Sequence, residues 1–133
     1  MWQNPAVLDH LGINCDDVDA SAVFYDAVLA PLGSKRVMEF EVPGGRVVGY
    51  GIAPKATFWI APNAEGPANR ETHIAFVAST RDEVRAFFEA AVSTGAEVLH
   101  EPRVFPEYHE HYYGAFVRDP NGHNVEAVCH TPG

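Results

Sequence analysis

The sequence is short of cysteine and of positive charge. Its 133 residues include two cysteines, Cys15 and Cys129, without a CxxC spacing, which favours buried free thiols in a reducing compartment over a disulfide framework. Lys and Arg number 9 against 18 Asp and Glu, and the net charge of -9 disfavours nucleic acid and anionic membranes as partners. We therefore expect a small-molecule ligand.

Long apolar runs and common nucleotide or nucleophile motifs are also lacking. No stretch of about eighteen apolar residues occurs, and "MWQNPAVLDH" at the start lacks the basic region and apolar core of a secretory signal. We therefore expect a cytoplasmic location. The absence of a glycine-rich phosphate loop, a nucleophile elbow and a dinucleotide fingerprint disfavours the enzyme classes that use them.

The chain does contain an internal repeat. The segment "HLGINCDDVDASAVFYDAVL" from His10 aligns without gaps on "HIAFVASTRDEVRAFFEAAV" from His73. Each copy has the pattern of an alternating strand, a polar turn and an amphipathic helix. Three strand-like segments follow each helix, at 35–42, 46–52 and 57–61 in the first copy and at 96–100, 112–118 and 123–129 in the second.

These elements predict an α+β fold of two βαβββ modules, at about 8–62 and 71–131, in a single domain over 1–133. The linker at 61–71, "APNAEGPANRE", is rich in Pro, Gly and Asn. It does not imply two domains, because a module of about 60 residues buries its helix and sheet poorly alone. We expect the curved mixed sheets to surround a cavity, with modules paired within or between chains.

The helices have recognisable end signals. Thr80 and Glu83 have the spacing of a capping box, and Gly95 suits a left-handed cap at the end of the second helix. Pro31 and Gly33 stop the first helix. Each helix therefore lies between the first and second strands of its module.

The first strand of each module carries a histidine on its less bulky face. Side chains alternate along a strand, and the bulky apolar face suits packing beneath a helix. His10 and His73 therefore point to the opposite, concave face. Their neighbours there, Gly12 and Ala75, are small and leave room for a ligand.

Glu126 stands in an otherwise apolar run near the end of the chain. Burying a carboxylate without a partner is costly, so Glu126 should face solvent, be paired or bind a metal. The turn signal "DPNG" at 119–122 makes the last two strands a hairpin. A simple four-residue turn places Glu126 opposite Ala115, with Tyr113 on the same face, and a bulge would shift this register by one.

His10, His73 and Glu126 come from three separate strands. Two imidazoles and one carboxylate match a facial triad, which holds a divalent ion with open positions for substrate. A hydrogen-bonded structural histidine and a solvated glutamate are the competing interpretations. Spacing alone leaves both open.

Four motifs carry a family resemblance. Paired βαβββ modules with "DHLGIN", "THIAFV", "FYDAVLAPLG" and "DPNGHNVEAV" resemble the vicinal oxygen chelate superfamily. It includes glyoxalase I, methylmalonyl-CoA epimerase, extradiol dioxygenases, fosfomycin-modifying enzymes and bleomycin-binding proteins. The resemblance covers nearly the entire chain and implies that His10, His73 and Glu126 bind one divalent ion, Fe, Mn, Ni or Zn.

The resemblance also implies a function. A fourth ligand position of the family falls near Trp59, whose indole cannot coordinate a metal. The pattern therefore looks more like extradiol dioxygenases or fosfomycin-modifying enzymes, or like a glyoxalase-type relative in which water fills the fourth position. The implied activity is that of a metal-dependent lyase, isomerase or dioxygenase that binds substrate through vicinal oxygens. A homodimer is implied, in which sites can be shared between subunits. The alternative is a metal-free small-molecule-binding protein like the bleomycin-resistance members.

Further residues are candidates for chemistry or substrate binding. His109 and Tyr113 in "EYHEHYYGAF" could donate a proton or orient an oxyanion, beside Glu126 as the third catalytic candidate. A surface loop of polar aromatics is the competing interpretation. The candidate substrate-binding residues are Trp59 as a pocket wall and Arg46 and Arg103 as partners of an anion. The histidines expected at the surface are His100, His123 and His130.

Overall fold

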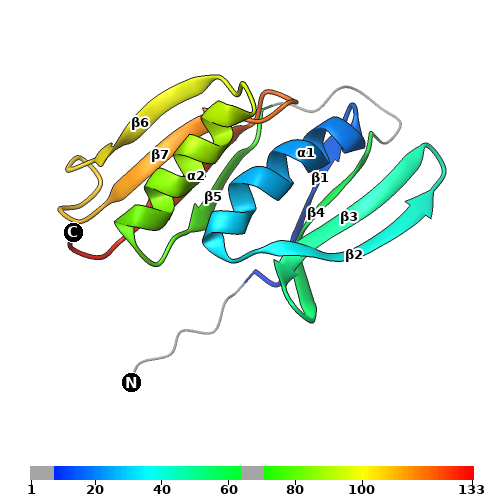
Figure 1. The fold of residues 1–133 in the computed structure, drawn as a ribbon, viewed down its shortest axis with the longest axis horizontal. Helices are drawn as coiled ribbons and strands as arrows, with labels where there is room; N and C mark the ends of the chain where they lie inside the picture. The colour runs from blue at the N-terminus through cyan, green and yellow to red at the C-terminus, as the bar shows by residue number, and fades with distance from the viewer. Residues whose placement is uncertain (1–7, 64–70) are drawn as a thin grey trace.

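The computed structural model describes residues 8–63 and 71–133 and contains the predicted repeat (Figure 1). The first module consists of β1 (Leu11–Cys15), α1 (Val18–Leu29), a short 3-10 helix (Ala30–Leu32), β2 (Lys35–Val42), β3 (Gly45–Ile52) and β4 (Lys55–Pro62). The second consists of β5 (His73–Val77), α2 (Arg81–Ser93), β6 (Val98–Val104), β7 (Tyr113–Arg118) and β8 (Asn124–Cys129). The α+β fold with two βαβββ modules is therefore confirmed, although β6 lies further along the chain than predicted.

Each module forms a four-stranded mixed sheet. The strand orders are β1-β4-β3-β2 and β5-β8-β7-β6, with β1 parallel to β4 and β5 parallel to β8. The first and last strands of a module are therefore neighbours. As a result, Gly12 lies beside Trp59 in the first sheet, and Ala75 lies beside Glu126 in the second.

Local signals explain where the helices begin and end. The Asp17 side chain caps α1, and the Thr80 hydroxyl accepts a hydrogen bond of 3.1 Å from the Glu83 backbone N–H at the start of α2. Gly33 and Gly95 follow the helical segments with positive φ angles of 82° and 84°, which glycine adopts without a steric penalty. The predicted end signals are thus confirmed.

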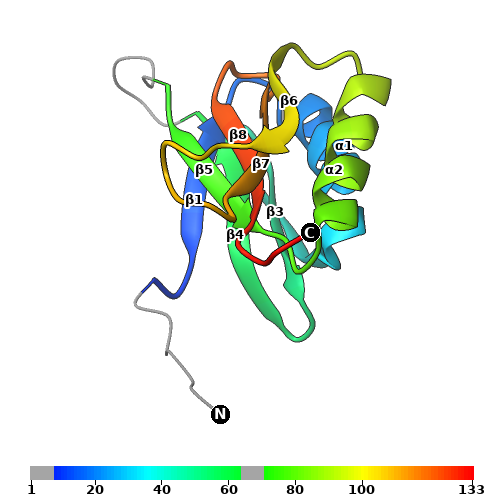
Figure 2. The same ribbon diagram turned by 90° about the vertical axis from the view of Figure 1, so that its left-hand side faces the viewer.

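Both helices lie on the same side of the two sheets (Figure 2), so the opposite side of the sheets is free of helices. The core forms between the helices and the strand faces below them, and both cysteines are buried there as free thiols, as predicted. No helix among residues 8–63 and 71–133 is long and apolar enough to cross a membrane. The largest fully buried apolar side chains are Tyr25, Val28, Leu29, Val48, Tyr50, Ile60, Val84, Phe87, Val117 and Val125.

The turn of the last hairpin joins the second module to the first. The buried Asp119 accepts a hydrogen bond of 2.7 Å from the Tyr25 hydroxyl of α1 and bonds of 2.9 Å from the backbone N–H groups of Asn121 and His123. The Asn121 side-chain oxygen accepts a bond of 2.9 Å from the Asp16 N–H. The motif "DPNG" is therefore a turn and also part of the contact between modules.

His123 does not lie at the surface, so that prediction is wrong. Its side chain is only 3% exposed, and Nδ1 accepts a hydrogen bond of 2.9 Å from the Thr72 N–H. The ring is buried because the parallel pairing of β5 and β8 brings the residue before β5 against the residue before β8.

Candidate functional site

The helix-free face of the second sheet carries the histidine and carboxylate pair. Across the strands, Ala75 of β5 is paired with Glu126 of β8, Glu126 with Phe116 of β7, and Phe116 with His100 of β6. His73 opens β5 on the same face. Glu126 therefore lies between a small side chain and an aromatic ring.

The predicted register of the hairpin is wrong by one residue. Arg118 pairs with Asn124, so the connection spans 119–123 and is one residue longer than the simple turn. Glu126 consequently lies opposite Phe116 and not Ala115. Because side chains alternate, this shift turns Tyr113 to the helix side of the sheet.

Tyr113 accordingly contacts α2 and not Glu126. Its hydroxyl accepts a hydrogen bond of 3.0 Å from Arg85 Nη1, and the Arg81 guanidinium lies 4.9 Å from the centre of its ring. The predicted placement of Tyr113 on the same face as Glu126 is therefore wrong.

Glu126 is buried and paired, not solvent-facing. Its side chain is 1% exposed, and Oε1 lies 2.8 Å from His73 Nε2. The Tyr112 hydroxyl donates a hydrogen bond to the other carboxylate oxygen, Oε2. Since the His73 side chain is 50% exposed, its ring connects the buried carboxylate to the open face of the sheet.

Tyr112 is the functional candidate that sequence reasoning missed. Burial and the hydrogen bond to Glu126 raise the pKa of Tyr112, so the phenol remains a donor at neutral pH. The only sequence signal was its position in the aromatic segment before β7. Its face depended on the hairpin register, and a simple turn assigned Tyr113 instead.

His10 does not join His73 and Glu126 within one chain. It directly precedes β1, its side chain is exposed, and Nδ1 lies 2.8 Å from Asp9 Oδ2. The strands β1 and β5 run in opposite directions in Figures 1 and 2, so the two strands begin at opposite edges of the sheets. The structure thus brings together two of the three predicted ligands.

The donor chemistry of His73 and Glu126 fits a divalent transition metal, which accepts mixed imidazole and carboxylate ligands. Two protein donors do not complete such a site. Within the described ranges, 8–63 and 71–133, no group of three His, Cys, Asp or Glu side chains could hold a metal ion. A third protein ligand would have to come from outside this arrangement.

Trp59 lies on the corresponding face of the first sheet. Its ring covers Gly49, where an added Cβ would come within 2.6 Å of the indole. Phe40 lies 6.2 Å from the indole, measured between ring centres. These aromatic side chains and His10 border an open cavity of about 550 Å³.

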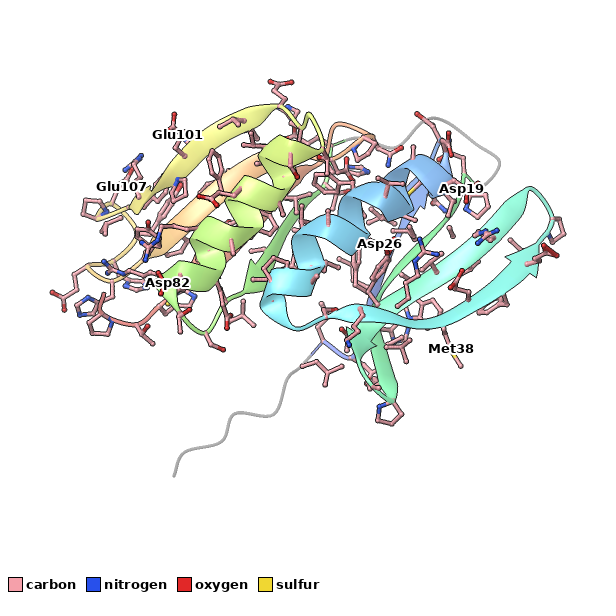
Figure 3. All side chains as sticks on the ribbon, viewed as in Figure 1. Asp19, Asp26, Met38, Asp82, Glu101 and Glu107 are labelled. Carbon is pink, nitrogen blue, oxygen red and sulfur yellow. The ribbon has the colours of Figure 1, made fainter. Side chains whose placement is uncertain are left out.

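The predicted anion-binding arginines already have partners. Asp19 extends from α1 (Figure 3). Arg46 lies 3.5 Å from Asp19 and 3.2 Å from Glu39. It shares the helix side of β3 with the buried Tyr50, so it does not face the same side as Trp59. Arg46 therefore points away from the cavity beside Trp59, and its role as a partner of a substrate anion stays a prediction.

Arg103 and His109 lie around the aromatic segment before β7. The Arg103 guanidinium is 3.7 Å from the centre of the Phe105 ring and 3.6 Å from the Glu107 carboxylate. His109 Nε2 lies 2.9 Å from His130 Nδ1, and the His109 ring meets Tyr112 edge-on at 5.6 Å. His109 therefore contacts Tyr112, which binds Glu126, whereas Arg103 contacts neither residue of this pair in the contacts described.

Comparison with known proteins gives one family and many similar folds. The model of the Glyoxalase/Bleomycin resistance protein/Dioxygenase superfamily matches residues 7–127. A glyoxalase/bleomycin resistance protein from Albidiferax ferrireducens T118 is 24% identical, with a TM-score of 0.78 and 93% and 99% of the two chains covered. The comparison with curated proteins gives no match.

Two solved structures of similar fold belong to proteins that are named for an activity. A lactoylglutathione lyase from Agrobacterium tumefaciens is 22% identical, with a TM-score of 0.66 and 95% of each chain covered. A mutant of the fosfomycin resistance protein FosX from Listeria monocytogenes, complexed with Mn(II) and 1S,2S-dihydroxypropylphosphonic acid, is 18% identical. Its TM-score is 0.65, with 93% of this chain and 90% of that chain covered. At these identities the likeness concerns the fold.

Proposed function

The chain belongs to the glyoxalase/bleomycin resistance protein/dioxygenase superfamily, and from this premise we propose that it is a divalent-metal-dependent enzyme acting on a small molecule through vicinal oxygens. The observation that carries the proposal is the buried Glu126 carboxylate held 2.8 Å from the half-exposed His73 on a helix-free sheet face. When bound, a divalent ion supplies Lewis acidity toward substrate oxygens. The lyase and the Mn(II)-bound FosX of similar fold support this class of activity.

In this proposal the third ligand is His10 of a second copy of the chain. His10 is exposed and directly precedes β1, which begins at the opposite edge of the sheets from β5. The apolar side chains of Met38 and Phe40, on β2 at the other edge of the same sheet, are 54% and 50% exposed, and a second copy would remove them from water. A two-fold dimer would then contain two equivalent sites, each with donors from both copies.

The chain's own residues divide the remaining work. Glu126 and His73 bind and orient the ligand, and the Trp59 side of the first sheet supplies an apolar wall. Tyr113 was the third candidate for proton transfer, but it faces α2. Proton transfer in this proposal is therefore assigned to Glu126 and His109. The metal-free binding protein is the alternative function, and it requires the cavity beside Trp59 but not the His73–Glu126 pair.

Metal content tests the proposal directly. Protein purified without chelators or a histidine tag, then incubated with Fe(II), Mn(II), Ni(II) or Zn(II), should bind about one ion per chain by elemental analysis. His73→Ala should abolish uptake, whereas His111→Ala, on the loop before β7, should bind as the unmodified protein does. Sub-stoichiometric metal that does not rise on incubation would refute the enzyme and favour metal-free binding.

A mixture of two variants tests whether the site is shared. His10→Ala and His73→Ala should each bind no metal alone. Unfolded together and refolded, they form heterodimers in which one site has all three donors, so metal binding should partly return. If the three donors came from one chain, every site in the mixture would lack a histidine, and binding would not return.

A further inference from the structure

We propose that Tyr112 is a positioning residue for Glu126: its hydroxyl holds Oε2, so that the carboxylate offers Oε1 alone to a ligand beside His73. The inference deepens the proposed function and rests on it. Its basis is the division of the two carboxylate oxygens between two side chains, His73 at Oε1 and Tyr112 at Oε2.

Because Glu126 is buried, the loss of either hydrogen-bond partner would leave a carboxylate oxygen without a donor. An ionised carboxylate only accepts hydrogen bonds, and Glu126 is 1% exposed, so water cannot freely replace a missing donor at Oε2. A carboxylate with one oxygen tied to a fixed donor cannot rotate to present both oxygens. Glu126 would then act as a monodentate group whose free direction is set by Tyr112.

The backbone leaves space for this hydrogen bond at one position. A Cβ added at Gly114 would lie 3.3 Å from the Ala127 carbonyl oxygen and 3.4 Å from both Glu126 Oε2 and the Tyr112 ring. A methyl group at 114 would therefore fill the space beside the hydrogen bond to van der Waals contact. A side chain larger than a methyl group would have to displace the carboxylate or the phenol.

Tyr112 is held by contacts that do not involve its hydroxyl. Its carbonyl accepts a hydrogen bond of 2.7 Å from the Phe105 N–H. The rings of Phe105, Tyr108, His109 and His130 surround it at distances of 4.9 to 6.1 Å between ring centres. Because these contacts fix the ring, the hydroxyl is placed at Oε2 before any ligand binds.

The test compares Tyr112→Phe with Tyr113→Phe, which removes the neighbouring hydroxyl on the helix side of β7. Co(II) reports both affinity and ligand geometry, through calorimetry and its visible absorption. Removing a group that orients a metal ligand typically costs 10-fold to 100-fold in affinity. We expect Tyr112→Phe to bind one Co(II) per chain with a Kd raised by about 10-fold or more and an altered visible spectrum.

Tyr113→Phe should bind Co(II) with the affinity and spectrum of the unmodified protein. The melting temperatures of the two variants without metal check that a change in Co(II) binding does not reflect unfolding. If the unmodified protein binds Co(II) and Tyr112→Phe matches it in Kd and spectrum, the role of Tyr112 is refuted and the proposed function stands. If the unmodified protein binds no Co(II), the proposed function fails and this role fails with it.

A second variant applies if Tyr112→Phe does not fold. Gly114→Val keeps the hydroxyl but adds two methyl groups to a Cβ that would already lie 3.4 Å from Oε2 and from the Tyr112 ring. A raised Kd and an altered Co(II) spectrum in this variant support the positioning role. Binding identical to that of the unmodified protein overturns it.

Discussion

Replacing Tyr25 with phenylalanine should measurably weaken the contact between the two modules. The Tyr25 ring is fully buried and packs 4.9 Å from the rings of both Phe24 and Phe58, measured between centres. Tyr25→Phe keeps this packing and removes only the hydroxyl that donates to Asp119 Oδ2 at 2.7 Å. Burial and the charge of Asp119 raise the pKa of Tyr25 well above its usual value, so the hydroxyl is a donor throughout the neutral range.

The expected loss follows from the burial of Asp119, which is 5% exposed. Its other oxygen keeps the two backbone donors, and Oδ2 loses its only side-chain partner among the described residues. A hydrogen bond to a charged, buried acceptor contributes about 1.5–3 kcal/mol. For a domain of this size each kcal/mol corresponds to about 3 °C, so the melting temperature should fall by about 5–9 °C.

Thermal and urea denaturation followed by circular dichroism measure this change. Tyr50→Phe is the matched control, because its hydroxyl donates at 2.9 Å to Asp26, whose side chain is 44% exposed and can recruit water. The control should lose about 0.5–1 kcal/mol. A loss below about 0.5 kcal/mol in Tyr25→Phe, or one no larger than in the control, would refute the reasoning.

Two further changes test the first module. Gly49→Ala places a Cβ 2.6 Å from the Trp59 ring. The free energy of unfolding should therefore fall by about 1–3 kcal/mol, and the tryptophan fluorescence should shift. An unchanged spectrum and stability would mean that the indole does not cover Gly49. Burial raises the pKa of Asp26, but hydrogen bonds from Arg36 and Tyr50, together with the charge of Arg36, outweigh it and hold the pKa below its usual value. This pair therefore stabilises the fold above about pH 4, the unfolded value, and the contribution is lost as pH falls through the lower folded pKa. Arg36→Gln should flatten the dependence of melting temperature on pH between about 2 and 5, and a curve parallel to that of the unmodified protein would contradict this.

The repeat and its elements could be predicted from the sequence because their signals are local. The capping pair Thr80 and Glu83, the turn "DPNG" and the alternation of small and bulky residues each act within a few positions along the chain. The same alternation predicted which face of its strand His73 occupies, and the family motifs indicated both His73 and Glu126 as candidate ligands. Their contact at 2.8 Å then follows from the parallel pairing of the first and last strands.

The wrong predictions concern positions whose placement depends on the exact length of a turn or on a contact with a distant part of the sequence. A connection over 119–123 in place of the simple turn moved every side chain of β7 to the other face, exchanging Tyr113 for Tyr112. His123 is buried by a strand that lies far away in the sequence, which no pattern near the residue could indicate.

The sequence by itself determined the two βαβββ modules and the ends of their helices, and the family motifs pointed to His73 and Glu126 as candidate site residues. Only the tertiary structure decided which tyrosine meets that carboxylate, and that His10 does not meet the pair within one chain. The physical reason is that periodicity and capping depend on neighbouring residues. Register depends on the exact length of a turn, and the relative placement of two histidines depends on how whole modules pack.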